Sequence, residues 1–323
     1  MRIVLDAMGT DHAPAAEVAG AIAALREMDD DIEVVLVGDQ GVIEAELTRH
    51  DDVPRGRLVV HHAPDRVTGS DAPASVLRRK PASSIVVGLK LVQSGEAQAF
   101  VSAGSTGAVM ATSMLTLRPL PGVDRPAIGT VLPTAAGPCL MLDAGANVDC
   151  KPHHLLQFAH LGNIYAQDLM GIERPRVGLL NIGEEPEKGD ELTVETHKLL
   201  SAEPGLHFVG NLEGRDIIQG VCDVVVCDGF VGNVLLKFYE SVAEFIIGLL
   251  KEQVQNVPEQ LDFNDVFRVL DYAEYGGAPL LGVGGVSMIC HGESSPRAIQ
   301  NALAAAARAV RSDMVDHIAR ELA

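Results

Sequence analysis

Short apolar runs alternate along the chain with loops of glycine, aspartate, serine or asparagine and then with amphipathic stretches. Such runs are typical of buried strands, and the stretches after the loops place apolar residues at helical spacing. The expected strands are residues 2–5, 33–37, 99–102, 139–142, 176–180, 206–209, 224–227 and 280–289. The expected helices are residues 15–28, 41–50, 153–170, 191–200 and 296–322. A further helix is expected to follow the loop at 102–107 and to end at residue 115. Strands that alternate with helices predict an α/β fold, with a mostly parallel sheet covered by helices on both faces.

Two apolar segments, residues 127–132 and 139–142, interrupt this alternation because they enclose only the sequence PTAAGP. Proline and glycine in so short a connection predict an antiparallel hairpin, so the sheet is expected to be mixed. No clear linker divides the chain. We therefore expect a single domain over residues 1–323, with a lobe boundary near residues 119–126.

The stretch 224–237, VVVCDGFVGNVLLK, combines a buried strand, a glycine-bearing loop and a helix. The loop runs from Asp228 to Asn233, and the helix is expected to begin near Asn233. Such a loop points free backbone N–H groups beyond the strand end, where ligands bind in parallel α/β sheets. It is therefore a candidate site for an anion or a developing oxyanion. The alternative is a short connection without chemistry.

The helix after Asn233 is apolar over a wide face, and a second apolar segment follows it at residues 260–275. One interpretation of the region of about 238–275 is a helix pair in the core or at a dimer contact. The other is a surface that touches a membrane. The apolar residues at helical spacing in the first helix are Leu235, Phe238, Val242, Phe245, Ile246, Leu249 and Leu250.

Composition narrows the classes of protein that fit this pattern. The formal net charge of −19 argues against nonspecific nucleic-acid binding and against electrostatic adsorption to anionic lipid. No segment offers about 18 uncharged apolar residues, so no membrane-spanning helix is expected. The N-terminal residues MRIVLD begin a strand rather than a signal peptide. The five cysteines have no CxxC spacing and several lie in apolar runs, which indicates reduced core thiols in a cytoplasmic protein.

Other strand-end loops carry candidate ligand groups. In the first loop, Asp6 and Asp11 could orient a polar ligand, although Asp11 could instead cap the next helix. The segment SAGSTG, residues 102–107, offers hydroxyls and glycines that suit a phosphate oxygen or a pantetheine amide, or else form a helix N-cap. In the loop NIGEEPEKGD, residues 181–190, Lys188 could bind phosphate and be held by Glu184 or Glu185. The alternative for that loop is a solvated charge run.

Arg78, Arg79 and Lys80 form the densest basic cluster of this acidic chain. The cluster is either a solvated face or a docking patch for an acidic protein or a phosphate-bearing group. The Walker A, HExxH and GxSxG motifs are absent from the sequence, and GVGGVS at 282–287 is not the GxGxxG of nicotinamide sites. The common nucleotide, zinc-protease and serine-hydrolase sites are therefore not expected.

Taken together and in this order, the loops resemble those of the PlsX family of bacterial phosphate acyltransferases, which act in phospholipid synthesis. The segments DAGANVDCKP and LLNIGEEPEKG carry the most specific part of the resemblance. The matching stretches cover nearly the whole chain: residues 6–14, 99–111, 125–134, 141–166, 176–192, 210–217, 223–237 and 280–292.

The resemblance implies a three-layer α/β/α fold similar to the isocitrate/isopropylmalate dehydrogenases and the phosphate acetyltransferases. It implies transfer of the acyl group of acyl-acyl-carrier-protein (acyl-ACP) to inorganic phosphate, which gives acyl phosphate and free carrier protein. It also implies a homodimer in the cytoplasm, in peripheral contact with the membrane and with a downstream glycerol-phosphate acyltransferase. No cofactor, metal or nucleic acid is expected.

By motif, the catalytic pair of the family corresponds to Lys188 and Asn233. Lys188 is expected to position phosphate, and Asn233 is expected to donate to the thioester oxygen. Docking of the acidic carrier protein is expected at Arg78, Arg79 and Lys80. The residues expected to bind substrate are Asp6, Gly9, Asp11, Ser102, Gly104, Ser105, Thr106, Gly107, Asp143, Asn147, Asn181, Glu184, Asp228, Gly229, Gly232 and His291.

The chain departs from the usual family pattern at Thr10, Ser105, Asp190 and Gly284. A CoA-dependent phosphate acyltransferase is the nearest alternative. A metal- and NAD-dependent 2-hydroxyacid dehydrogenase on the related fold is more distant, because Asp143 and Asp149 alone would support it. A nonenzymatic scaffold for lipid enzymes at the membrane is the third alternative.

Overall fold

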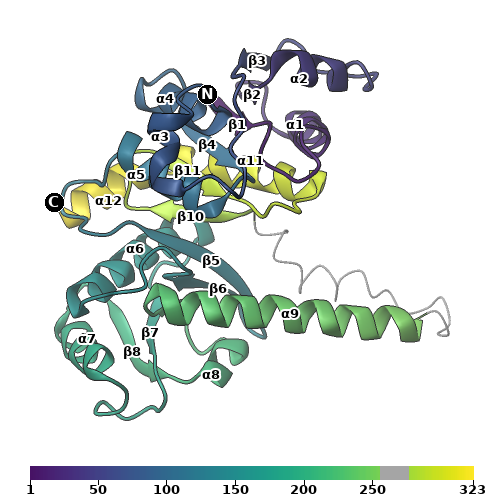
Figure 1. Cartoon of the computed structure of the whole chain (residues 1–323). Coiled ribbons are helices and arrows are strands. Elements are labelled where there is room, and N and C mark those ends of the chain that lie inside the picture. Colours follow the sequence, from purple (N-terminus) through teal and green to yellow (C-terminus); the bar gives the residue numbers. More distant parts are fainter. Residues whose placement is uncertain (255–275) are drawn as a thin grey trace. The chain divides into compact units, whose positions relative to one another are not determined.

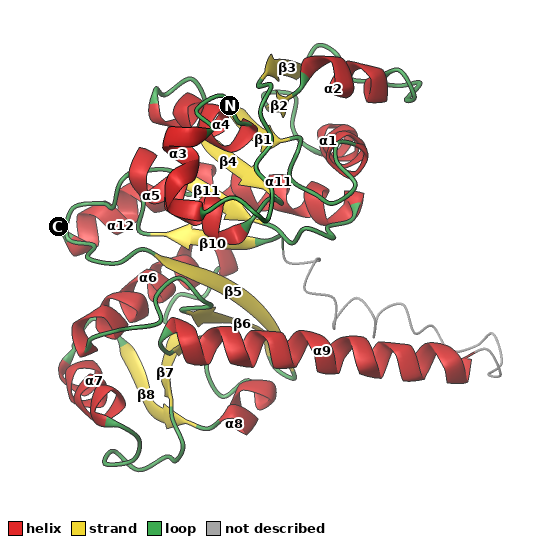
Figure 2. Ribbon diagram, viewed as in Figure 1, coloured by secondary structure: helices red, strands yellow, loops and turns green. Residues whose placement is uncertain are grey.

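The computed structural model describes residues 1–254 and 276–323 of the chain. Contacts between residues divide the chain into two compact units (Figure 1). Unit 1 comprises Met1–Ile128, Asp168–Gly171 and Tyr275–Ala323, and unit 2 comprises Gly129–Gln167 and Ile172–Glu274. The fold is a three-layer α/β/α arrangement with a mostly parallel, mixed sheet (Figure 2), as the sequence predicts.

Unit 1 contains six strands in the order β3-β2-β1-β4-β11-β10. The first five run parallel to their neighbours, whereas β10 is antiparallel to β11 and to the first two residues of β5. The strands are β1 (Arg2–Asp6), β2 (Glu33–Gly38), β3 (Leu58–His62), β4 (Ala99–Ser102), β10 (Ala278–Leu281) and β11 (Val286–Ile289). The helices are α1 (Ala15–Glu27), α2 (Gln40–Leu47), α3 (Val76–Arg79), α4 (Ser84–Gln93), α5 (Thr106–Thr116), α11 (Pro296–Arg311) and α12 (Met314–Leu322), with a 3₁₀ turn η1 (Pro73–Ser75) before α3.

Unit 2 contains five strands in the order β5-β6-β9-β7-β8. β5 and β6 form the predicted antiparallel hairpin, and the other pairs are parallel. The strands are β5 (Ala127–Thr134), β6 (Gly137–Leu142), β7 (Arg176–Leu180), β8 (His207–Leu212) and β9 (Val224–Val226). The helices are α6 (Pro152–Met170), α7 (Glu191–Ala202), α8 (Gly214–Gln219) and α9 (Gly229–Val254).

The cores of both units are aliphatic, because the chain has no tryptophan and few other aromatic residues. In unit 2, Gly162 of α6 lies directly on the sheet. A Cβ atom at this position would lie 2.5 Å from Val224 Cγ1 and 3.0 Å from Leu142 Cδ1. The absence of a side chain there lets the helix approach β6 and β9 closely enough to bury both strands.

The sequence predicted no element for β3, α3, α4 and α8, and several boundaries differ by a few residues. Three differences change the arrangement of elements. The apolar run 280–289 is two antiparallel strands, β10 and β11, because Gly282 turns the chain with a φ of 88°. The C-terminal helix is divided into α11 and α12 at Asp313, which has a φ of 51°. The helix expected from Asn233 begins at Gly229. The predicted segment 260–275 lies outside the described residues, so the two interpretations of its contacts remain predictions.

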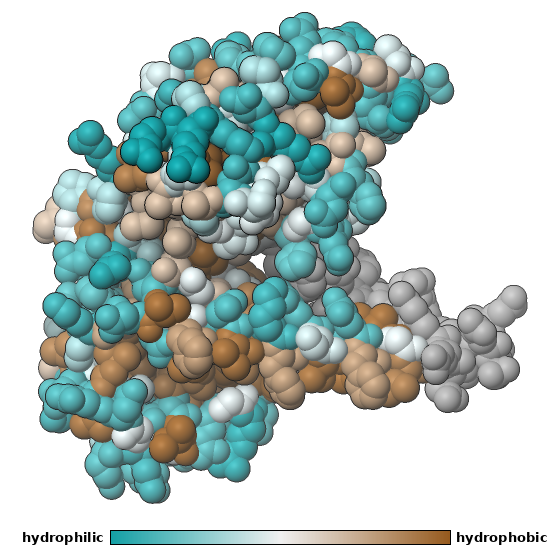
Figure 3. Space-filling view, in the orientation of Figure 1, coloured by the Kyte–Doolittle hydropathy of each residue, from teal (hydrophilic) through white to brown (hydrophobic). Residues whose placement is uncertain are grey.

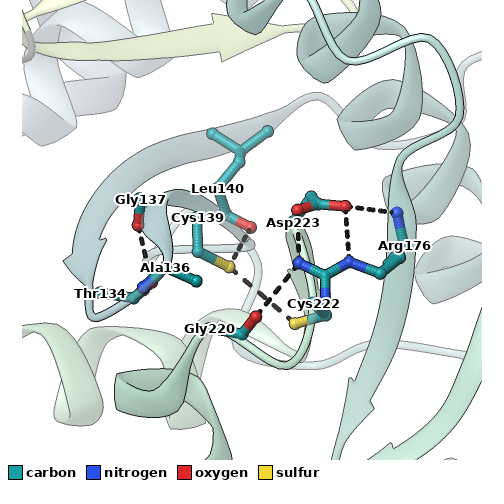
Figure 4. A network of polar contacts seen from close by, with 9 residues as sticks. All are labelled: Thr134, Ala136, Gly137, Cys139, Leu140, Arg176, Gly220, Cys222 and Asp223. Carbon is teal, nitrogen blue, oxygen red and sulfur yellow. Dashed lines mark hydrogen bonds and ion pairs between the residues drawn. The ribbon is translucent and has the colours of Figure 1, made fainter.

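Four of the five cysteines are buried, as predicted, and all five are free thiols. Cys139 and Cys222 lie with their Sγ atoms 3.9 Å apart, beside an ion pair between Arg176 and Asp223 (Figure 4). Arg176 donates to Asp223 through Nε at 3.1 Å and through Nη2 at 2.8 Å, which fastens the start of β7 to the turn before β9. The hydrogen bond to Cys222, together with burial, holds the pKa of Cys139 well above its ordinary value.

Candidate functional site

The loop after β6 is closed by Asp143. This fully buried carboxylate accepts hydrogen bonds from the backbone N–H groups of Gly145, Ala146 and Asn147, at 3.2, 3.1 and 2.6 Å. The Asn147 side chain donates to the same carboxylate at 3.0 Å. Asp143 and Asn147 therefore shape the loop, and their predicted contact with substrate stays a prediction.

The first turn of α9 lies against this loop. Gly229 N donates to the carbonyl of Asn147 at 2.7 Å. A Cβ atom at Gly229 would lie 2.7 Å from Asp143 Oδ2, and one at Gly232 would lie 1.9 Å from the carbonyl oxygen of Asp143. Both glycines are therefore required by the close approach of helix and loop. The structure brings together these four residues, which the sequence singled out.

The backbone N–H groups at the start of α9 are not free, so the prediction of a backbone anion cradle in this loop is wrong. Asp228 Oδ1 accepts from Phe230 N at 2.8 Å and from Val231 N at 3.0 Å. Gly232 N donates to the Asp228 carbonyl at 3.0 Å as part of the helix. Asp228 is an N-cap that satisfies the donors which a helix otherwise leaves exposed.

Asn233 follows this capped turn with its side chain exposed to solvent. A Cβ atom at Gly145 would lie between 3.4 and 3.5 Å from Cβ, Cγ and Oδ1 of Asn233. The carboxamide of Asn233 thus lies over the glycine of the 143–147 loop. Throughout the described part of the chain it has no hydrogen-bond partner. Its N–H donors are therefore available to a ligand at the carboxyl end of β9.

The 181–190 loop of unit 2 is fixed by two asparagines. Asn181 Nδ2 donates to the carbonyl of Lys188 at 2.9 Å. Asn211, which is buried at the end of β8, donates to the carbonyl of Glu185 at 2.8 Å. His197 of α7 lies 2.8 Å from Asn211 Oδ1 and completes the chain of contacts. Hydrogen bonds to the backbone, rather than ion pairs between side chains, hold the loop in shape.

Lys188 projects from this loop with an exposed side chain. Its stem lies over Gly183, where a Cβ atom would be 3.1 Å from Lys188 Cγ. Within the described residues its ammonium group forms no ion pair, so the expectation that Glu184 or Glu185 holds it is wrong. Glu184 instead lies with Glu185, Glu213 and Arg215 around a separate polar cleft. The ammonium group of Lys188 is therefore available to an anion.

An apolar cleft of about 740 Å³ separates the 181–190 loop from the first turns of α9. Lys188 and Asn233 belong to the segments that form its two walls, although other residues of these segments line it. One wall is formed by Asn181, Ile182, Gly189, Asp190 and Thr193, and the other by Asp228, Phe230, Val231, Val234, Leu235 and Phe238. Leu155, Leu180 and Cys227 complete the lining.

Cys227 is the one thiol among the cleft's lining residues. Burial raises the pKa of this thiol well above its ordinary value, and the Sγ atom lies 3.7 Å from the carbonyl oxygen of Asp143 as its hydrogen-bond donor. A protonated, buried thiol is a poor nucleophile. The lining of the cleft therefore contains no activated cysteine.

The strand-end loops of unit 1 form a second group of the predicted residues. Ser102 Oγ donates to Asp6 Oδ2 at 2.7 Å and accepts from Gly104 N at 3.0 Å. A Cβ atom at Gly9 would lie 2.8 Å from Gly104 N, so the two loops touch. Asp6 is buried, and this burial raises the pKa of its carboxyl group. Hydrogen bonds from Ser84 and Ser102 partly offset this rise by lowering the pKa. The four predicted residues Asp6, Gly9, Ser102 and Gly104 thus support one another.

Ser105 and Thr106 begin α5, and within the described residues their hydroxyls have no hydrogen-bond partner. Gly107 packs against Pro73, where a Cβ atom would lie 3.0 Å from Pro73 Cγ. Asp11 is exposed and its N–H donates to the carbonyl of Gly292 at 2.9 Å, which places the loop of His291 beside it. Asp11 does not cap α1, because Pro14 occupies the N-cap position without a side-chain bond.

The comparison with known proteins decides the family. A family model described as "Fatty acid synthesis protein" matches residues 1–317. A protein of Heliobacterium modesticaldum named phosphate acyltransferase is 50% identical over 98% of this chain and 96% of its own. Another of the same name from Desulforamulus reducens is 49% identical over 100% of this chain and 97% of its own. The chain belongs to this phosphate acyltransferase family.

Two phosphotransacylases are among the solved structures that resemble this member of the phosphate acyltransferase family in fold. The EutD phosphotransacetylase from Staphylococcus aureus superposes with a TM-score of 0.64 at 16% identity, over 96% of this chain and 94% of its own. A branched-chain phosphotransacylase from Enterococcus faecalis superposes with a TM-score of 0.61 at 16% identity, over 95% of this chain and 99% of its own. At this identity the likeness concerns the fold.

The three residues of the basic cluster in this phosphate acyltransferase, Arg78, Arg79 and Lys80, have two different environments. Lys80 Nζ forms an ion pair with Asp71 Oδ2 at 2.7 Å and donates to the carbonyl of Arg66 at 2.8 Å. The hydrogen bond from Lys80 lowers the pKa of Asp71 to about 2. Arg78 and Arg79 are exposed and, among the described residues, unpaired. Lys80 shapes its own loop, so the two arginines are the cations free for a partner.

Sequence reasoning missed two buried polar residues. Asn211 belongs to the stretch GNLEGRDI and was not singled out. An asparagine at a strand end is nevertheless well suited to hold a neighbouring loop through hydrogen bonds to its backbone. Glu17 lies within the helical pattern of α1, and nothing in that pattern indicates its contact with the loop before it. Its carboxylate accepts from Thr10 N at 2.7 Å and from Thr10 Oγ1 at 3.0 Å. Burial raises the pKa of Glu17 to about 7.

Proposed function

We propose that this protein transfers the acyl group of acyl-ACP to inorganic phosphate, giving an acyl phosphate for phospholipid synthesis. The observation that carries the proposal is the placement of Lys188 and Asn233 in the two segments that wall one apolar cleft. Each offers an exposed polar head with no partner in the described part of the protein. The names of the relatives and the family support the same reaction class.

Phosphate needs positioning more than activation in this reaction. Inorganic phosphate carries nucleophilic oxygens near neutral pH, and a thioester has a good leaving group. One phosphate oxygen attacks the thioester carbonyl carbon, the carbonyl becomes a tetrahedral oxyanion, and its collapse expels the carrier's thiolate. Holding the two reactants in an attacking geometry removes much of the entropic cost of the step. Lys188 supplies a mobile positive charge that holds and neutralises phosphate.

The oxyanion requires a hydrogen-bond donor. Because Asp228 caps the backbone N–H groups of Phe230 and Val231, we assign this role to the Asn233 carboxamide. A donor of this kind contributes about 10²–10³ in rate. The remaining predicted residues would shape the site or bind the rest of the donor, with the hydroxyls of Ser105 and Thr106 as candidates for polar contacts.

The choice of carrier protein as donor rests on the basic cluster. An acidic carrier would be repelled by a chain of net charge −19 unless it met a local positive patch. Arg78 and Arg79 provide two exposed cations with no partner among the described residues. We place the carrier's docking contact there, with Lys80 as the residue that holds the adjoining loop.

The apolar surface of α9, part of which is visible in Figure 3, is proposed as the contact with a second copy or with a membrane surface, where a glycerol-phosphate acyltransferase would take the product. Phe238 is 67% exposed and Phe245 66% exposed on this helix. Among residues 1–254 and 276–323, no helix has both the length and the apolar character needed to cross a bilayer. The membrane contact that we propose is a peripheral one, made by a protein of the cytoplasm.

The test mixes purified protein with acyl-ACP and follows release of the carrier thiol with and without inorganic phosphate. The proposal expects thiol release that depends on phosphate and an acyl phosphate product in equal amount. Release that ignores phosphate would contradict it. Equal turnover of acyl-ACP and acyl-CoA would favour the CoA-dependent alternative, and a phosphate-independent absorbance change with NAD would favour the dehydrogenase.

Removing either polar head should abolish most of the activity while the protein stays folded. We expect Lys188→Ala and Asn233→Ala each to lower kcat/KM by about 10²-fold or more, the range typical for lost transition-state donors. Lys198→Ala is the matched control, because Lys198 is an exposed lysine of α7 that pairs with Glu195. Turnover near that of the unmodified protein in either variant would remove the assigned role. Circular dichroism of all three variants monitors folding.

A further inference from the structure

Two cysteines of unit 2 lie next to each other in the folded chain. Cys139 belongs to β6, and Cys222 lies in the short segment between α8 and β9. Both are buried, and their Sγ atoms are 3.9 Å apart although the residues are 83 positions apart in the sequence. Figure 4 shows the two sulfur atoms facing one another. The fold therefore creates a pair of thiols that no sequence spacing indicates.

The backbone around Cys222 is fixed by its neighbours. Arg176 donates through Nη2 to the carbonyl of Gly220 at 3.1 Å, and its backbone N–H donates to the Asp223 carboxylate at 2.8 Å (Figure 4). Leu140 N donates to the carbonyl of Asp223 at 2.9 Å. The residues that follow the two cysteines are thus joined directly, which holds Cys222 beside β6.

The spacing of the two cysteines suits a disulfide bond. Neighbouring strands lie about 4.8 Å apart, and a disulfide joins Cα atoms that are about 4.4–6.8 Å apart. Bonded sulfurs lie about 2.0 Å apart, so the two Sγ atoms need to approach each other by about 1.9 Å. Rotation of the two side chains can supply this shift while the strands stay paired.

We propose that Cys139 and Cys222 form a reversible disulfide within one chain when the protein is exposed to hydrogen peroxide. The peroxide oxidises the Cys222 thiol to a sulfenic acid and releases one water. The sulfur of Cys139 then displaces the hydroxyl group, which leaves as a second water with the proton of the Cys139 thiol. The two thiols lose two electrons in total, and the peroxide gains them.

Cys222 is the thiol that meets the oxidant first. Its neighbour Val221 is 39% exposed, whereas Cys139 lies inside the sheet between β5 and β9. The hydrogen bond with Cys222, together with burial, holds the pKa of Cys139 well above its ordinary value. Because the thiolate is the reactive form of cysteine, Cys139 reacts slowly. We therefore expect the bond to form during prolonged exposure to excess peroxide.

The bond would join the amino-terminal parts of the two strands that lead into the candidate site. β6 continues into the loop that Asp143 closes, and β9 continues into Asp228 and α9. A cross-link at these positions closes a loop of about 83 residues and restricts the unfolded chain. The carboxyl ends of both strands stay free. The oxidised protein should therefore be more stable than the reduced protein and equally active.

The test treats the reduced protein with excess hydrogen peroxide, alkylates the remaining thiols and maps the cross-link by peptide mass spectrometry with fragmentation. We expect a bond between Cys139 and Cys222, a Tm higher by about 5 °C, and loss of both after treatment with a dithiol reductant. Cys139→Ala and Cys222→Ala should show no rise in Tm on oxidation. Cys290→Ala is the matched control, because Cys290 is a buried thiol of unit 1, and it should still form the bond.

The outcomes do not depend on the proposed function, because mapping and Tm need no turnover. Absence of a bond between Cys139 and Cys222 in the unmodified protein would overturn the inference, and this measurement requires no variant to fold. An equal rise in Tm in Cys222→Ala, or a disulfide between two copies on a non-reducing gel, would also overturn it. Loss of phosphate-dependent turnover on oxidation in the unmodified protein, but not in Cys222→Ala, would contradict the separation of this bond from the site.

Discussion

Two glycines that look like helix breakers lie inside a helix. Gly229 and Gly232 occupy the first turn of α9, where glycine normally costs stability. They are tolerated because the carbonyls and the carboxylate of the 143–147 loop occupy the space of their side chains. The position of Asn233 above Gly145 depends on this close approach. No larger side chain fits at either glycine without a shift of the backbone, so these two positions tolerate substitution poorly.

Gly232→Ala should destabilise the protein by about 2 kcal/mol or more, the cost of forcing an extra methyl into a packed contact. The new Cβ would lie 1.9 Å from the Asp143 carbonyl oxygen, so α9 must shift and carry Asn233 with it. Urea denaturation and kcat/KM should both register the change. Gly248→Ala on the same helix is the control, because a Cβ there meets nothing within 4 Å, and it should stabilise by about 0.5–1 kcal/mol. Equal stability of the two variants would contradict this explanation.

Glu17 is a buried carboxyl that the proposed reaction does not use. Its carboxylate accepts hydrogen bonds from Thr10, which stands where the phosphate acyltransferase family usually has glycine. Burial raises its pKa from 4.5 to about 7, so the folded protein holds a proton that the unfolded chain releases at lower pH. Between these values the folded state binds more protons, and its stability therefore falls as pH rises.

Glu17→Gln should remove this part of the pH dependence. The stabilisation from the raised pKa is complete below pH 4.5 and is lost as pH rises through about 7. Its size is on the order of 3 kcal/mol, since one pKa unit corresponds to about 1.4 kcal/mol. Urea denaturation at about pH 5 and about pH 8 should show the unmodified protein losing more stability than Glu17→Gln. Identical pH profiles would show that Glu17 does not titrate in this range.

At the scale of elements, the sequence predicted most of the strands, but it missed β3 and joined β10 and β11 into one run. The runs at β4 and β7 were predicted with their exact ends, because each is a short, largely apolar run that a polar loop follows directly. The predicted start of α9 was four residues too late, because Gly229 and Gly232 have low helix propensity and made the first turn look like a loop. Which loops meet was suggested by the α/β topology, but the contacts of Asn211 and Glu17 join residues whose pairing no local pattern shows.

The cap of α9 should be separable from the chemistry. Asp228→Ala removes the acceptor of the Phe230 and Val231 N–H groups and should cost about 1 kcal/mol in urea denaturation. Asp228→Ser restores an N-cap oxygen and should recover most of that loss. Because Asn233 follows one turn later, activity should fall with Asp228→Ala and recover with Asp228→Ser. Lost activity in the serine variant at normal stability would instead assign the carboxylate a direct role.

At the scale of the whole molecule, charge governs which partners can approach. A net charge of −19 repels acidic proteins over a distance set by salt, whereas the exposed side chains of Arg78 and Arg79 would attract them locally under the proposed docking. Recognition of an acidic carrier would therefore depend on a few cations against an unfavourable background. Such an arrangement would select a partner mainly through its association rate and its orientation on the surface, and less through the strength of the final complex.

Reversing these two charges should affect the carrier-bound donor alone. We expect Arg78→Glu with Arg79→Glu to raise KM for acyl-ACP about tenfold, the range of a few lost charge contacts, and to leave acyl-CoA turnover unchanged. Arg49→Glu with Arg55→Glu is the control, because these exposed arginines pair with Glu46 and Glu44 elsewhere in unit 1. A similar rise in both double variants would indicate a general charge effect without a docking patch.

The length of α9 has a mechanical consequence. Its 26 residues form a rod of about 39 Å, and Asn233 stands near one end of it. The packing of Gly229 and Gly232 on the 143–147 loop and the hydrogen bond from Tyr239 to the carbonyl of Pro133 attach the first three turns of this rod to unit 2. The exposed side chains of Phe245 and Leu249 lie further along the same rod. A partner that binds these side chains would therefore act on the same rigid element that carries Asn233.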